Sequence, residues 1–360
     1  MGTYLIVGAD PVKAASLHPG GVLTLTVGVL NFAKRNGHDV VIVNTARSPF
    51  IHESFFSKFS TGINRLVEVF GHLHARKFSG AIIFSGAGVG FYERILMSLL
   101  CRLFRTKDVF IIVAGNFFRL RESSWFRRSV TRLTLRIPYR LVASGRNWTY
   151  LFDEFGVTAS RQITMHYWLA DFPLASQPKV RPERRPVHML YVGWLIQEKG
   201  VLELLAAITV LRREYDFTFT FVGGGTLLET VRLAISESNW KEAVAAPGWI
   251  SAVALQDCLA SADVFVLPSY AEGFPMSLIE AFSCAMPAIV TDVGGVSDSL
   301  RDGVNGFLIQ PRSVESLVTA MGRYLADPSL IPLHSSAALA VVIENHDPDS
   351  NCRILFEVLD

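Results

Sequence analysis

The sequence predicts an α/β protein with two doubly wound, parallel-sheet domains. The chain has 360 residues, more than one compact domain usually holds. Short runs of β-branched and aromatic residues alternate with longer amphipathic segments, an order typical of parallel sheets. Residues 173–186 interrupt this alternation with proline and charge, as a linker does. We therefore expect a first domain over 1–172, a second over 187–345, and a C-terminal helix over 346–360.

The first domain opens as strand, loop, helix and strand. Thr3–Gly8 and Asp39–Asn44 are the apolar strands, and a helix ends near Arg35. Gly20 and Gly21 precede that helix. They could form a plain tight turn, or they could let the backbone approach an anionic group at the helix N-terminus. Further strands are expected at Ala81–Ser85, Val109–Val113 and Leu141–Ser144.

Residues 119–140 have the most unusual composition in the chain. Their only acid is Glu122, and Trp125 and Phe126 lie among the basic residues. The arginines are Arg119, Arg121, Arg127, Arg128, Arg132, Arg136 and Arg140. A helix with this pattern can lie on an anionic bilayer surface. It can equally pack its apolar face on its own sheet and leave the arginines solvated. The sequence does not decide between the two.

The second domain begins with two strands that lead into glycine loops. Val187–Val192 is followed by the loop Gly193–Gly200, which contains Trp194 and Lys199. Phe217–Val222 is followed by Gly223 and Gly224, a weak signal for a turn that faces a nucleotide. The segment Pro247–Ser251 then carries Trp249.

The stretch from Leu267 to Gly295 is the most informative part of the sequence. It follows a buried-type strand that ends at Leu267, and it places Glu272 in the next loop and Glu280 in a helix expected to start near Ser277. Ligands of parallel sheets bind beyond such strand ends. Each glutamate also has a simpler interpretation. Glu272 could be solvated, and Ser277 with Glu280 fits a capping box.

Read as a whole, this stretch resembles a known family. The matching residues are Glu272-Gly-Phe-Pro-Met-Ser-Leu-Ile-Glu280, Ala281, Pro287, Asp292, Gly294 and Gly295. They resemble the EX7E segment of retaining glycosyltransferases of family 4, which have the GT-B fold. The resemblance is strong over residues 187–310 and weak over 1–170. It implies two Rossmann-like domains with an interdomain cleft, and a last helix that crosses back to the first domain.

The resemblance also implies site roles and a donor, a nucleotide-diphosphate sugar of the UDP or GDP type. Glu280 would accept hydrogen bonds from the ribose, Glu272 would hold hydroxyls of the transferred sugar, and Lys199 would stabilise the leaving diphosphate. Further donor contacts would come from Gly193, Trp194, Gly223, Gly224, Trp249, Gly273, Phe274, Pro275 and Ser277. The loop at Gly20 and Gly21 would face the donor phosphates and the acceptor. No cofactor or metal is expected.

Two departures from the family pattern keep an alternative open. Trp194 stands where the family has an arginine that binds the diphosphate, and Ala114 stands where many members have a histidine beside the sugar. The alternative is a degenerate, non-catalytic GT-B protein that binds a sugar nucleotide or a partner enzyme. An epimerase or a phosphorylase of the same fold does not fit the EX7E spacing. We expect a retaining transferase that acts on a lipid-linked or polysaccharide-precursor glycan.

Composition limits the partners and the location. The net charge of +2 argues against a general nucleic-acid binder. The four cysteines show no CxxC or metal-ligand spacing, which is typical of buried, reduced thiols. No signal sequence and no apolar run of about 18 residues is evident. We expect a cytoplasmic protein, at the inner face of the membrane if the arginine-rich stretch contacts anionic lipid.

Overall fold

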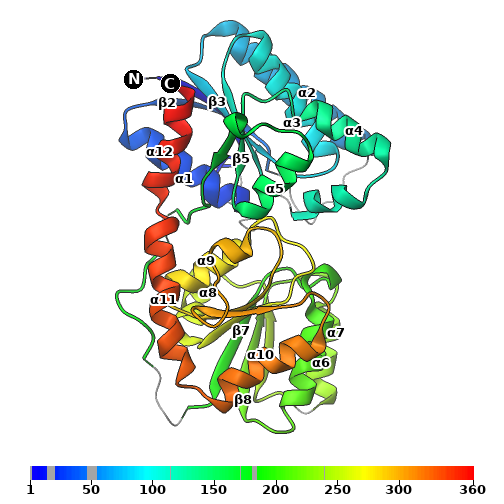
Figure 1. Cartoon of the computed structure of the whole chain (residues 1–360), viewed down its shortest axis with the longest axis vertical. Helices are drawn as coiled ribbons and strands as arrows, with labels where there is room; N and C mark the ends of the chain where they lie inside the picture. Colours follow the sequence, from blue (N-terminus) through cyan, green and yellow to red (C-terminus); the bar gives the residue numbers. More distant parts are fainter. Residues whose placement is uncertain are drawn as a thin grey trace. The chain divides into compact units, whose positions relative to one another are not determined.

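The computed structural model describes residues 2–13, 21–46, 55–113, 115–170, 172–180, 185–238 and 240–360. The chain divides into unit 1, residues 1–171 with 347–360, and unit 2, residues 172–346. Each unit contains a six-stranded parallel sheet with helices on its faces (Figure 1). The predicted α/β class with two doubly wound domains is confirmed.

Unit 1 has the strand order β2-β1-β3-β4-β5-β6. Its strands are β1 Thr3–Gly8, β2 Asp39–Asn44, β3 Gly80–Ser85, β4 Asp108–Ile112, β5 Arg140–Ala143 and β6 Gln162–Thr164. Its helices are α1 Gly21–Arg35, α2 Phe55–Ala75, α3 Val89–Leu103, α4 Trp125–Thr134, α5 Arg146–Glu154 and α12 Pro348–Leu359, with short 3-10 helices at Gly115–Glu122 and Ala159–Arg161.

Successive side chains of β1 contribute to two cores, one on each face of the unit 1 sheet. Successive side chains of a strand point to opposite faces of the sheet. Leu5 and Val7 belong to the core cluster that α2 and α3 complete. Tyr4 points the other way, and its ring meets Phe356 of α12 at a centroid distance of 4.7 Å. The sheet therefore has α2 and α3 on one face and α1 and α12 on the other (Figure 1).

Unit 2 has the strand order β12-β11-β10-β7-β8-β9. Its strands are β7 Val187–Val192, β8 Phe217–Val222, β9 Val244–Gly248, β10 Val264–Leu267, β11 Ala288–Thr291 and β12 Gly306–Ile309. Its helices are α6 Val201–Leu211, α7 Leu228–Glu237, α8 Ala252–Ser261, α9 Met276–Ser283, α10 Val314–Ala326 and α11 Leu330–Asn345, with short 3-10 helices at Gln197–Lys199 and Val296–Asp298.

The segment that the sequence suggests as a linker packs on unit 2. The backbone N–H of Ala175 donates to the carbonyl of Ser283 at 2.7 Å, and the ammonium of Lys179 donates to the carbonyl of Leu259 at 3.0 Å. At the other boundary, Asp347 caps α12 by accepting from the backbone N–H of Ser350 at 2.7 Å. The helix that begins there belongs to unit 1.

Candidate functional site

The candidate site in unit 2 lies at the point where the strand order of the sheet reverses. The chain places β8 on one side of β7 and β10 on the other, so β7 and β10 flank the point where the strand order reverses. In open parallel sheets the loops beyond the strand ends diverge there and leave room for a ligand. All four residues of β10 are buried, which fixes the start of the loop that carries Glu272. The loop after β7 carries Lys199.

Glu272 and Lys199 meet between these two loops. The Nζ atom of Lys199 lies 2.5 Å from Oε1 of Glu272. The hydroxyl of Ser269 donates to the same oxygen at 2.6 Å. Glu272 is only 8% exposed, so its carboxylate is held by a charge and a hydroxyl rather than by water. Oε2 takes part in neither contact. The interpretation of Glu272 as a merely solvated loop residue is therefore wrong.

Two glycines in the left-handed region let the surrounding backbone approach closely. At Gly200, with φ of +69°, an added Cβ would lie 2.1 Å from the carbonyl oxygen of Pro268. At Gly294, with φ of +61°, it would lie 2.1 Å from the carbonyl oxygen of Glu272. Gly295 also donates its N–H to the carbonyl of Gly273 at 3.0 Å. The backbone at Gly200 and Gly294 thus packs directly on the loop that carries Glu272, and a side chain at either position would collide with this loop.

Glu280 lies in α9, which begins one residue earlier than the sequence indicates. The N-cap is Pro275 and makes no side-chain cap, so Ser277 is the second helical residue. The capping-box interpretation of Ser277 with Glu280 is therefore wrong. The carboxylate of Glu280 is half-buried, and the loss of water around it raises its pKa to about 7. Among the described residues, no hydrogen bond or ion pair of this carboxylate is found.

Glu280→Gln is expected to stabilise unit 2 by an amount that depends on pH. In the folded protein the carboxyl keeps its proton up to about pH 7, whereas the ordinary value for an unfolded chain is 4.5. Between these values the folded state binds more protons, so the free energy of unfolding falls as pH rises. The gain from glutamine should grow from pH 4.5 to pH 7 and reach of order 1 to 3 kcal/mol above that. Urea unfolding of wild type and variant at pH 5 and pH 8 measures this gain in stability. An equal gain at both pH values would contradict the raised pKa of Glu280.

The comparison with known families bears on this part of the chain. The sequence pattern named "Glycosyl transferases group 1" matches residues 175–338. This segment, a little under half of the chain, resembles the glycosyl transferases group 1 family. TuaC of Bacillus subtilis (strain 168), a glycosyltransferase named for teichuronic acid biosynthesis, is 39% identical over 166 residues, 46% of this chain and 40% of TuaC.

Two further proteins are similar to the chain. The Escherichia coli UDP-Gal:alpha-D-GlcNAc-diphosphoundecaprenol alpha-1,3-galactosyltransferase is 32% identical over 150 residues, 41% of this chain and 35% of that enzyme. The matched part therefore spans about two fifths or less of the curated relatives. HepE of Anabaena, solved with UDP-glucose, superposes with a TM-score of 0.74 at 15% identity and covers 100% of this chain and 99% of its own. This likeness confirms the predicted GT-B fold.

Trp194, which the resemblance places at the position of a family arginine, packs on a second tryptophan. Its ring lies 5.0 Å from that of Trp249 at an interplanar angle of 80°. Trp249 in turn covers Gly224, where an added Cβ would lie 2.4 Å from the indole nitrogen. Gly223, with φ of +133°, lies against the carbonyl of Gly193. The structure thus brings Trp194 and Trp249 together beside the backbone of Gly193, Gly223 and Gly224. We call the two tryptophans the aromatic wall.

Three residues near the Lys199–Glu272 pair carry no sequence signal that distinguishes them. Ser269 binds Glu272, as described above. Tyr270 donates its hydroxyl to Glu203 at 2.7 Å, which fixes the same loop. His346, at the end of α11, packs on Phe274 at a centroid distance of 5.4 Å and is bonded through Nε2 to the hydroxyl of Ser299 at 2.9 Å. Phe274 is buried, so the loop after Glu272 is held on this side too.

In unit 1 the structure describes only part of the predicted features. Gly20 and Ala114 lie outside the described residues, and Gly21 is the first residue of α1. The arginine-rich stretch is a 3-10 helix followed by α4, and Arg136 lies beyond the end of α4. Trp125 is 81% and Phe126 71% exposed. Arg127, Arg128, Arg132 and Arg136 are exposed as well. The buried residue of α4 is Thr131, whereas Trp125, Phe126 and Leu133 are exposed, so these three apolar side chains do not pack on the sheet.

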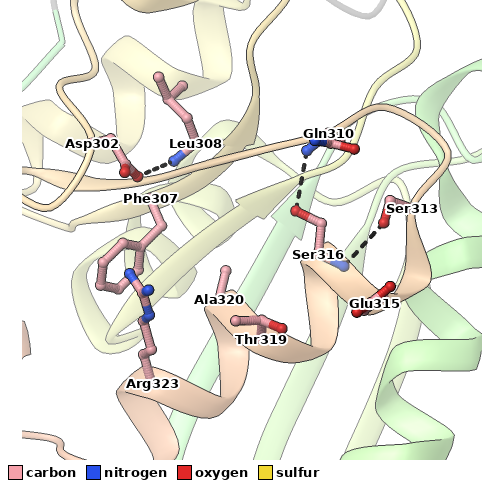
Figure 2. A pocket seen from close by; sticks show the side chains of 10 residues that line it. All are labelled: Asp302, Phe307, Leu308, Gln310, Ser313, Glu315, Ser316, Thr319, Ala320 and Arg323. Atoms are coloured by element: carbon pink, nitrogen blue, oxygen red, sulfur yellow. Dashed lines mark hydrogen bonds between the residues drawn. The ribbon is translucent and has the colours of Figure 1, made fainter.

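A separate pocket in unit 2 lies beside the edge strand β12 and α10 (Figure 2). Its polar groups bond to one another. The backbone N–H of Leu308 donates to the carboxylate of Asp302 at 2.9 Å, and the backbone N–H of Gln310 donates to the hydroxyl of Ser316 at 3.1 Å. Arg323 lies over the ring of Phe307 at 4.9 Å. None of the predicted site residues lines this pocket.

The described residues contain no group of three or more His, Cys, Asp or Glu side chains placed to hold a metal ion. No single helix among them has the length and apolar composition to cross a bilayer. The bent pair Val314–Ala326 and Leu330–Leu359 meets those two criteria together.

Proposed function

We propose that this protein is a retaining glycosyltransferase that moves a sugar from a nucleotide-diphosphate sugar to an acceptor hydroxyl of a lipid-linked or polysaccharide-precursor glycan. The observation that carries this proposal is the Lys199–Glu272 ion pair at the reversal point of the unit 2 sheet. The E. coli relative transfers galactose from a UDP sugar to a diphosphoundecaprenol acceptor, and HepE was solved with UDP-glucose. Both support a UDP-type donor, with the GDP type as the other candidate.

The contacts of the site suggest how each residue acts. The ammonium of Lys199 lies against Glu272 and is 24% exposed, so it can also face the leaving diphosphate. Glu272 offers Oε2 to hydroxyls of the transferred sugar. Glu280, half-buried in α9, accepts from the ribose, and the wall of Trp194 and Trp249 flanks the nucleotide. Because the family arginine is replaced by Trp194, Lys199 carries more of the diphosphate charge.

The transfer itself breaks the bond between the anomeric carbon and the diphosphate oxygen and forms a bond to the acceptor oxygen. The acceptor attacks from the face that the diphosphate leaves, and the leaving oxygen takes the acceptor proton. The anomeric configuration is retained, and the sugar passes through an oxocarbenium-like state. Lys199 and the start of α9 near Ser277 stabilise the negative charge that develops on the diphosphate.

The acceptor would reach unit 1 at a membrane surface. Trp125, Phe126 and the arginines of α4 are exposed together, a pattern that suits the boundary of an anionic bilayer. A lipid-linked acceptor would be held in such a bilayer. The cytoplasmic face of the membrane is accordingly the proposed location. The non-catalytic alternative is less favoured, because a protein that merely binds a sugar nucleotide does not need the Lys199–Glu272 pair.

A thermal-shift screen of the full chain with UDP, GDP, ADP, CMP and their sugars tests the donor. A ligand at about a hundred times its Kd adds about 2.7 kcal/mol to the free energy of unfolding. We expect a shift of Tm with UDP and a UDP sugar. The shifting donor is then incubated with lipid-linked acceptors, and NMR of the product gives its anomeric configuration. Inversion would overturn the retaining mechanism, and no shift with any nucleotide would favour a non-catalytic protein that binds a partner enzyme.

A further inference from the structure

Helices α2 and α3 of unit 1 are apolar on two sides. One side faces the sheet and buries residues such as Val69, Leu73 and Ile95. The other side is exposed. In α2 the exposed apolar residues follow one another at intervals of four, four and three, which places them on one face of the helix. Together with those of α3 they are Phe59, Ile63, Val67, Phe70, Leu96, Leu99 and Leu103. We call this set the α2–α3 apolar face.

The two stripes belong to one surface. α2 and α3 lie side by side on the same face of the sheet (Figure 1). The carboxylate of Glu93 in α3 binds Arg65 of α2 at 2.7 Å, which ties the helices together below the surface. Above it, the ring of Phe70 meets that of Phe104, just after α3, at a centroid distance of 5.6 Å. Soluble monomers rarely leave so many large apolar side chains exposed in one patch.

The charge around this surface is strongly one-sided. Residues 55–140 contain 15 Lys and Arg against 4 Asp and Glu, whereas the rest of the chain contains 19 against 28. Two of those four acids are not available at the surface. Glu93 is paired with Arg65 and Arg94, and Asp108 is buried and accepts from the hydroxyl of Ser98 at 2.7 Å. Arg65 and Arg94 are buried beside Glu93, but the remaining basic residues of this segment still outnumber its other acids. The segment that carries the apolar face is thus rich in positive charge.

We propose that the α2–α3 apolar face docks on an anionic lipid bilayer and inserts its side chains among the acyl chains. It extends the contact proposed for α4 and rests on that part of the proposed function. An anionic bilayer supplies both an apolar interior and negative headgroups. A second copy of the chain would bring an equally positive surface against the first, and like charges oppose such pairing. Nucleic acid would leave the aliphatic side chains without a partner.

Vesicle co-sedimentation tests the docking surface. The full chain is mixed with vesicles of phosphatidylcholine alone or with about 30% phosphatidylglycerol. The variant Phe59→Ser, Val67→Ser, Leu103→Ser removes three exposed apolar side chains. The matched control removes three from unit 2, Leu233→Ser, Val253→Ser and Leu333→Ser, whose exposure is similar. We expect the α2–α3 variant to bind anionic vesicles about tenfold more weakly than wild type and the control to bind like wild type.

A second variant separates this inference from the contact of α4. It carries Trp125→Ser and Phe126→Ser. If it loses binding while the α2–α3 variant binds like wild type, the α2–α3 proposal is overturned and the contact of α4 stands. If wild type fails to prefer anionic vesicles, both are overturned, while the transferase proposal is untouched. Light scattering tests the other occupant: a wild-type dimer that the α2–α3 variant abolishes would show that a second copy covers the face. Thermal melting of each variant checks that it folds.

Discussion

Glu272→Gln is expected to lower kcat by about a hundredfold or more and to leave the fold intact, an effect similar to that of removing one preorganised electrostatic contact. Glutamine has the same shape but no charge. It can still accept from the hydroxyl of Ser269, which lies 2.6 Å from Oε1 in wild type. It cannot neutralise Lys199, whose ammonium lies 2.5 Å from the same oxygen. The substitution therefore changes the charge of the site and not its packing. Steady-state kinetics with the donor found by thermal shift measures kcat and KM separately.

The matched control for this prediction is Glu198→Gln. Glu198 precedes Lys199 in the same short helix, and its side chain is exposed. Both substitutions remove one negative charge near Lys199, but only Glu272 contacts the ammonium. We expect the control to keep kcat within about twofold, because exposed charges interact weakly through water. Equal turnover of Glu272→Gln and wild type would remove Glu272 from the reaction. An effect on KM alone would assign it to binding that does not change in the transition state.

The sequence predicts the strands of unit 2 better than its ligand contacts. Val187–Val192 and Phe217–Val222 are short strand-like runs that each end at a glycine, and the structure has β7 and β8 at the same residues. Lys199 and Glu272 are 73 residues apart. Nothing local in the sequence says that they touch. Their contact follows from the strand order, which places β10 beside β7, and without the family resemblance that order could not be derived.

Helix α2, by contrast, is a long element that the sequence patterns do not predict. A helix of a soluble domain is recognised by one apolar stripe opposite a polar face. In α2 the residues Phe59, Ile63 and Val67 add a second stripe on the exposed side. Ser60, Asn64 and Glu68 are exposed beside them, so the outer side of α2 is mixed rather than purely polar and marks the helical period less clearly. The failure of the pattern and the proposed docking surface have the same origin, because exposed apolar residues signal a partner rather than a core.

Glu280 shows how one residue of register changes a functional interpretation. The sequence allows Ser277 as the N-cap, and the side chain of Glu280 would then cap the start of the helix by bonding to the backbone N–H of Ser277. In the structure Pro275 is the N-cap, and Glu280 lies beyond the first turn of α9. Its carboxylate is then left for a ligand. Helix boundaries are the weakest part of any pattern analysis, since several cap residues often compete within a few positions.

Gly294→Ala is expected to destabilise unit 2 by about 2 to 5 kcal/mol, a loss at the upper end for single substitutions. Gly294 has φ of +61°, and an added Cβ would lie 2.1 Å from the carbonyl oxygen of Glu272 and 2.7 Å from that of Gly273. Both atoms are backbone, so they cannot rotate away. The loop that carries Glu272 has to shift, and we expect the site to lose donor binding together with stability. Urea unfolding followed by tryptophan fluorescence, and the Tm shift with nucleotide, measure the two effects.

Gly303→Ala separates the clash from the backbone conformation. Gly303 has nearly the same φ, +71°, but nothing lies within 4 Å of an added Cβ. Alanine there carries only the cost of the left-handed region, about 1 to 2 kcal/mol. The difference between the two variants is thus the contribution of the close approach of Gly294 to the Glu272 loop. Equal losses at both positions would mean that this loop gives way freely. The geometry of Glu272 would then depend on the side-chain contacts of its loop and not on the close approach of Gly294.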